Sequence, residues 1–96
     1  MIVDNNERST AVMSQKLKQT QDISIGDNLR KLRNHANLTQ EQVVAQLQLR
    51  NCSISRSAYS QIESGTYNIR ISELIALTEI FRTDYNTIFN GLTYEK

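Results

Sequence analysis

Cysteine and histidine are almost absent from this 96-residue chain, and proline is missing altogether. Cys52 is the only cysteine, which excludes an internal disulfide and a metal site built from cysteines alone. His35 is the only histidine, which leaves too few ligands for zinc and no histidine–nucleophile pair of the kind that hydrolases use. We therefore expect a protein without metal, without cofactor and without enzymatic activity.

Long apolar segments are also missing. The longest uninterrupted run covers residues 74–77, whereas a membrane-spanning helix needs about 20 apolar residues. The amino terminus lacks the basic start and apolar stretch of a secretory signal. Since 39% of the residues are hydrophobic and 22% are charged, the composition is that of a globular domain. We expect a cytoplasmic protein that does not contact membranes.

The charges nearly cancel, with 11 Lys and Arg against 10 Asp and Glu. Many nucleic-acid-binding domains are strongly basic, so a net charge of +1 weakens the case for nucleic-acid binding. The low net charge does not exclude such binding, because only the contacting face must neutralise phosphates. Aromatic residues make up only 6% of the chain, which argues against a platform for single-stranded RNA.

Residues 1–24 show no sustained apolar periodicity and are rich in Asn, Gln, Ser and Thr. We interpret them as a flexible amino-terminal arm with a nascent helix around residues 13–18, and as a possible attachment point for a protein partner. The alternative is a helix that packs on the body of the protein. Residues 93–96 are expected to form a short carboxyl-terminal tail.

Helical patterns begin at Ile25. Apolar residues recur at helical spacing over residues 25–36 and predict a first helix, which Asn37 can end in a left-handed conformation. Thr39 and Gln42 form the pattern of a capping box and predict the start of a second helix over residues 39–50. Ser55 can cap a third helix, residues 56–64, which Gly65 stops.

Two further helices follow. One is expected over residues 71–82 and the other over residues 85–90, between Asp84 as the cap and Gly91 as the end. Five apolar positions of the fourth helix are expected to be buried: Leu74, Ile75, Leu77, Ile80 and Phe81. Residues 66–71 alternate like a short strand, but we favour a loop because no second strand is evident.

Residues 25–92 are therefore predicted to form one all-α, five-helix domain. So small a core is marginally stable alone, and oligomerisation would help it. Apolar residues in excess of the core form a candidate dimer surface: Tyr85, Phe89, Leu92 and Tyr94.

The third helix has the features of a helix that reads DNA. A helix of this length fits the major groove, which is about 12 Å wide. Arginine can form two hydrogen bonds with guanine, and glutamine can do so with adenine. The outward positions of the helix are polar and not acidic: Arg56, Ser57, Ser60 and Gln61. The alternative is an ordinary solvated helix face.

Several segments resemble the phage-repressor/Cro-type (Xre-type) helix-turn-helix family. They are IGDNLRKLRNHANLTQEQVVAQL, ISRSAYSQIESG, ELIALTEIF and DYNTIF, and the resemblance extends from about residue 25 to residue 92. It implies a five-helix DNA-binding domain that binds a two-fold symmetric site as a homodimer. It also implies a bacterial or phage transcriptional regulator, with repression as our expectation. One departure is the connection over residues 47–54, which is longer than the tight turn usual in the family.

The resemblance also implies roles for individual residues. Arg56, Ser57, Ser60 and Gln61 match the positions that contact bases. Gln40 and Asn68 match positions that contact the DNA backbone, and Arg33 and Glu63 match an ion pair between the first and third helices. We expect the side chains of Arg56 and Gln40 to be exposed. The alternative function is a protein-interaction module of the same fold, such as an antitoxin or antirepressor.

Overall fold

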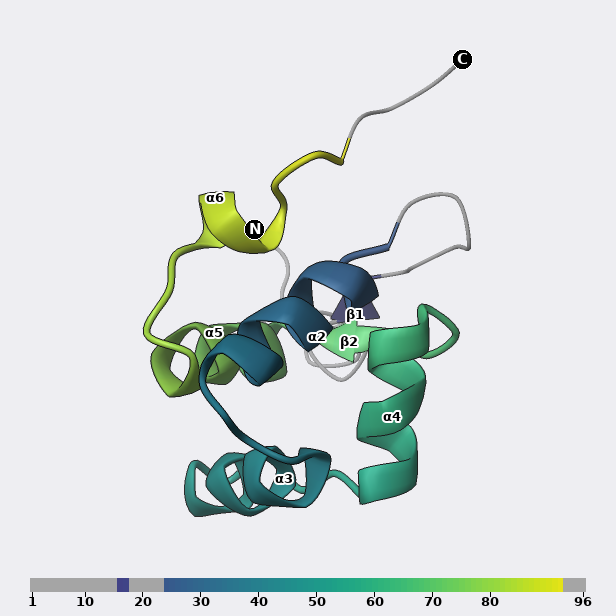
Figure 1. The fold of residues 1–96 in the computed structure, drawn as a ribbon. Helices are drawn as coiled ribbons and strands as arrows, with labels where there is room; N and C mark the ends of the chain where they lie inside the picture. Colours follow the sequence, from purple (N-terminus) through teal and green to yellow (C-terminus); the bar gives the residue numbers. More distant parts are fainter. Residues whose placement is uncertain (1–15, 18–23, 93–96) are drawn as a thin grey trace, which may run out of the picture.

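In the computed structural model, which describes residues 16–17 and 24–92, the chain forms five helices and two short strands (Figure 1). The helices are α2 (Gly26–His35), α3 (Gln40–Leu49), α4 (Arg56–Ser64), α5 (Ile71–Ile80) and α6 (Tyr85–Ile88). The strands are β1 (Lys16–Leu17) and β2 (Ile69–Arg70). The predicted all-α, five-helix architecture is confirmed.

Side-chain caps set the beginnings of three helices, as the sequence predicted. Thr39 Oγ1 accepts from the Gln42 amide at 3.1 Å, and Gln42 Oε1 accepts from the Thr39 amide at 2.8 Å. Ser55 caps α4 and Asp84 caps α6 through equivalent bonds of 3.0 Å and 2.8 Å. The side-chain and backbone hydrogen bonds with Thr87 lower the pKa of the Asp84 carboxyl. These bonds satisfy amides that have no partner within the helix.

The core lies where the inner faces of the helices meet. Eight side chains in it are fully buried: Leu29, Val43, Leu47, Tyr59, Ile62, Ile69, Leu77 and Ile88. The expectation that Ile75 is buried is wrong, since it is 45% exposed. Leu74 and Leu77 of α5, with Phe81 directly after the helix, already form the buried stripe, and Ile75 lies on the other side with Ile71.

Gly26 lets α2 approach α4 closely. A Cβ atom at this position would lie 2.2 Å from the carbonyl oxygen of Glu63, on the backbone of α4. Glycine is therefore required here for space. The contact places the start of α2 against the last turn of α4.

The loop expected over residues 66–71 is corrected by the structure. β2 pairs antiparallel with β1, with Lys16 opposite Arg70 and Leu17 opposite Ile69. The partner strand comes from the segment interpreted as an arm, so the helix expected around residues 13–18 is also wrong at Lys16 and Leu17. The rest of the proposed arm and tail, residues 1–15, 18–23 and 93–96, lies outside the described residues, as does Tyr94.

The long connection between α3 and α4 is anchored in the core at two points. Cys52 and Ile54 are each only 7% exposed, and the Cys52 amide donates to Leu47 O at 2.9 Å. Asn51, just before them, adopts a left-handed conformation with φ of 64°. Burial raises the pKa of the Cys52 thiol, with the charge of Glu73 adding to the effect. The extra residues therefore form a fixed bend between the two helices.

A side chain of α2 is hydrogen-bonded to the last described helix, α6, and to the turn after it. Asn28 Nδ2 donates to Ile88 O at 2.7 Å and to Asn90 O at 2.9 Å.

Within residues 16–17 and 24–92, no helix has both the length and the apolar character needed to cross a membrane.

Candidate nucleic-acid interface

The outer face of α4 is polar and open to solvent. Arg56, Ser57 and Gln61 are exposed, and Ser60 is half-buried. Glu63 is the one acidic residue of α4, and it points inward with a side-chain exposure of 3%. The four residues predicted to contact bases thus lie on one helix, without a carboxylate of that helix among them.

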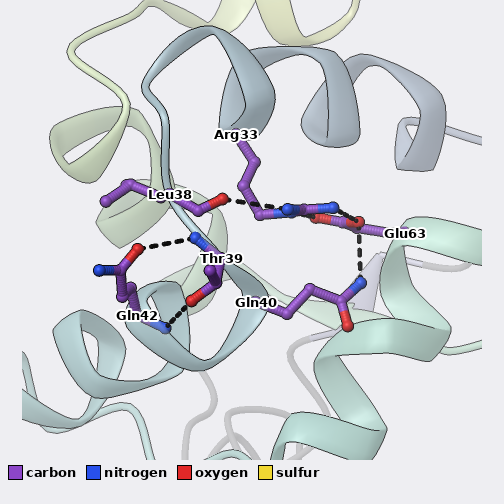
Figure 2. A network of polar contacts seen from close by, with 6 residues as sticks. All are labelled: Arg33, Leu38, Thr39, Gln40, Gln42 and Glu63. Atoms are coloured by element: carbon purple, nitrogen blue, oxygen red, sulfur yellow. Dashed lines mark hydrogen bonds and ion pairs between the residues drawn. The ribbon is translucent and has the colours of Figure 1, made fainter.

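A buried ionic network fixes α4 to α2 and α3 (Figure 2). Arg33 Nε donates to Glu63 Oε2 at 2.7 Å, and Arg33 Nη2 donates to Glu63 Oε1 at 3.1 Å. Gln40 Nε2, from the first residue of α3, donates to the same Oε1 at 3.0 Å. The remaining guanidinium nitrogen of Arg33, Nη1, donates to Leu38 O at 3.0 Å. The network therefore joins three helices at one carboxylate.

The charges of this network are stabilised where they lie. Burial opposes the ionisation of Glu63, but the hydrogen bonds and charge of Arg33, with further contributions from Tyr59 and Gln40, outweigh it, and the pKa of the carboxyl is lowered. The hydrogen bond with Glu63 raises the pKa of Arg33. Tyr59 is buried next to this network, and burial, followed by the Glu63 carboxylate, raises the pKa of its hydroxyl. Among the described residues that hydroxyl has no hydrogen-bond partner.

Gln40 lies at an open groove of about 560 Å³ in front of the first turn of α3. The expectation that its side chain is exposed is wrong: it is half-buried, because its amide nitrogen binds Glu63. The groove also contains Thr39 and extends to Arg56 at the start of α4. A helix start presents amide groups and the positive end of the helix dipole, which favour a phosphate.

Asn68, the other residue expected at the DNA backbone, is half-buried and lies in the segment between α4 and β2. It therefore follows the carboxyl-terminal end of α4, whereas Arg56 is at the amino-terminal end. The structure brings Gln40, Arg33 and Glu63 together through hydrogen bonds.

Sequence reasoning missed Glu41. Its Oε2 atom lies 3.3 Å from Arg56 Nε, so a carboxylate from α3 reaches the first residue of α4. An acidic residue in the first turn of a helix is common because it suits the helix dipole. Nothing in the local pattern indicated a partner 15 positions further along the chain.

Comparisons with known proteins agree with the fold. A family described as a helix-turn-helix domain matches residues 26–92. The fold is similar to the crystal structure of the restriction-modification controller protein C.AhdI from Aeromonas hydrophila, with a TM-score of 0.60 and 22% sequence identity. The similarity covers 70% of this chain and 94% of that protein. No curated protein matches the chain in sequence.

Proposed function

Because the chain belongs to the helix-turn-helix family of DNA-binding domains, we propose that it regulates transcription by binding specific duplex sequences. Members of this family are transcription regulators and not enzymes. In this proposal α4 enters the major groove, and the protein, a regulator of bacterial or phage type, acts as a repressor in the cytoplasm. Repression requires only that the bound protein occupies a promoter.

The observation that carries the proposal is the rigid presentation of α4. Its exposed side chains include Arg56 and Gln61, which have the chemistry to read guanine and adenine. The buried ion pair of Arg33 and Glu63 fixes the helix on the opposite side. To read bases, side chains must be held in fixed positions relative to the DNA. A helix that is anchored through a buried carboxylate holds its exposed side chains in this way.

Gln40 is proposed to position the protein on the DNA backbone. One hydrogen of its amide nitrogen is used by Glu63, which fixes the side chain at the start of α3. The second hydrogen remains to donate to a phosphate, aided by the helix dipole. Asn68 is proposed to contact the backbone beyond the carboxyl-terminal end of α4. Such contacts set register and carry no sequence information.

We further propose that two copies bind one symmetric site. Exposed apolar side chains occur in pairs four residues apart at the last two helices: Ile71 and Ile75 on α5, and Tyr85 on α6 with Phe89 directly after it. Pairs at this spacing share one helix face, and a second copy would cover them. Two recognition helices would then lie about 34 Å apart, one turn of DNA.

Selection of bound sequences from random duplexes tests the proposal. We expect a two-fold symmetric motif, with an affinity that falls steeply as salt rises. Arg56→Ala should weaken binding by about 1–3 kcal/mol and relax the preference at one base pair of each half-site. Gln40→Ala should weaken all sequences alike, and melting curves should accompany it because Gln40 also binds Glu63.

A different result would favour the interaction module. If Arg56→Ala stays folded and keeps both the affinity and the full preference profile, α4 does not read DNA through that residue. If the parent protein binds duplexes without steep salt dependence, the exposed apolar faces of α5 and α6 become the better candidate site, with a protein as the partner.

A further inference from the structure

An ion pair joins the starts of α3 and α4 on the outside of the molecule. Glu41 is the second residue of α3 and Arg56 is the first residue of α4, and Glu41 Oε2 lies 3.3 Å from Arg56 Nε. Their side chains are 65% and 61% exposed. An exposed pair with a single contact contributes little to folding. Its position at the tip of the proposed reading helix suggests another role.

The carboxylate engages the side of the guanidinium that does not read bases. Arginine recognises guanine with two parallel hydrogen bonds to O6 and N7, and its two terminal nitrogens form a suitable pair of donors. Glu41 is close to Nε, which leaves both terminal nitrogens of Arg56 available. Among the described residues, the Arg56 guanidinium has no second ion pair or hydrogen bond. A carboxylate at Nε therefore restricts the rotation of the group without occupying the pair of donors.

Glu41 also acts on the DNA as a charge. It borders the same groove as Gln40, where a phosphate is expected. A carboxylate beside a phosphate is repelled, and this repulsion is the same for every sequence. The repulsion therefore lowers the affinity for all duplexes and does not itself discriminate between them. Discrimination comes from Arg56, whose guanidinium, held at Nε by Glu41, forms the two-bond contact only with guanine.

We propose that Glu41 is a positioning residue that sets the base specificity of Arg56. It orients the guanidinium toward guanine, and its charge lowers the affinity for every duplex alike. This proposal rests on the proposed function, because it requires that α4 reads duplex DNA.

Glu41→Gln tests the proposal, since it removes the charge and keeps the size of the side chain. We expect the preference for guanine over the other bases at the Arg56 position to fall about tenfold, a substantial part of what one two-bond contact contributes. Affinity for unrelated duplex should rise. In an Arg56→Ala background, Glu41→Gln should leave the preference at that position unchanged, because the residue acts through Arg56.

Glu79→Gln is the matched control. Glu79 Oε1 lies 3.2 Å from Arg50 Nε, and the Glu79 side chain is 61% exposed. Glu79→Gln therefore removes the same charge as Glu41→Gln from a similarly exposed ion pair at a different place on the surface. It should leave the preference profile intact. If Glu41→Gln raises the affinity for all duplexes and leaves the guanine preference within twofold of the parent, Glu41 only repels DNA and the proposal is overturned.

The failure of the proposed function would look different. In that case the parent protein itself would select no motif from random duplexes. The melting midpoints of Glu41→Gln and Glu79→Gln should stay within a few degrees of the parent, so a loss of specificity in the first variant would not result from unfolding.

Discussion

Replacing Glu63 by alanine would remove the carboxylate at which three helices meet. The side chain is 3% exposed and accepts three hydrogen bonds, two from Arg33 and one from Gln40. Arg33, itself 13% exposed, would be left as a buried cation with one remaining bond to Leu38 O. Removing one partner of a buried pair costs about 3–5 kcal/mol. The bond to Leu38 and the partial exposure of Arg33 place Glu63→Ala at the lower end of this range.

The expected loss is large for a domain of this size. In a domain of 60–100 residues, 1 kcal/mol corresponds to about 4–8 °C in melting temperature, so about 3 kcal/mol corresponds to at least roughly 12 °C. Thermal unfolding followed by circular dichroism, with urea titration as a second measurement, would detect it. Glu79→Ala is the control, because it breaks an exposed pair with Arg50 and should shift the midpoint by only a few degrees.

A double variant separates a stranded charge from a loss of packing. Arg33→Met combined with Glu63→Leu removes both charges and keeps most of the volume, and such replacements are often neutral. It should recover most of the stability that Glu63→Ala loses. If Glu63→Ala melts within two degrees or so of the parent, or if the double variant is no better than Glu63→Ala, the network does not fix α4 as we infer.

Three smaller predictions follow from other features. The free energy of unfolding should decline below about pH 4, because the pKa of Glu63 is lower in the folded protein than in the unfolded chain. The stabilisation from ionised Glu63 is complete above the unfolded-state pKa of about 4.3 and is lost as the pH falls through the folded-state pKa. A pH series of urea midpoints measures this decline, and Glu63→Leu combined with Arg33→Met should flatten the pH dependence. Gly26→Ala should lower stability by about 3 kcal/mol in thermal unfolding, since its methyl group would overlap the backbone of α4, and a parent-like midpoint would contradict that packing. Arg82→Gly should raise stability by up to about 1 kcal/mol, because Arg82 has φ of 52° and glycine avoids that strain; Arg82→Ala, which keeps the strain, should melt like the parent.

Local chemistry made the helices predictable. Thr39, Ser55 and Asp84 each cap a helix through bonds that reach only three residues along the chain, so a short window of sequence contains the whole interaction. The left-handed residues Asn37 and Gly65 mark helix ends for the same reason. The family was recognisable because these signals recur at fixed separations.

The errors arose where distant segments meet. The strand at residues 16–17 pairs with residues 69–70, and neither segment reveals its partner. The apolar residues of α5 occur on nearly all sides of the helix, so periodicity could not place Ile75 outside the core. Gln40 appeared free to face solvent because its partner, Glu63, is 23 residues away. The Glu41–Arg56 contact depends likewise on how the bend between α3 and α4 directs two helix starts toward each other.

The buried cysteine in that bend gives the molecule its own reporter of opening. Cys52 is 7% exposed and its pKa is raised, so a thiol-reactive dye in solution meets almost no thiolate in the closed state. When opening and closing are fast relative to labelling, the labelling rate measures the free energy of opening between α3 and α4. A duplex that holds both helices would slow the reaction. A single native thiol could therefore follow DNA binding in real time, without an engineered label.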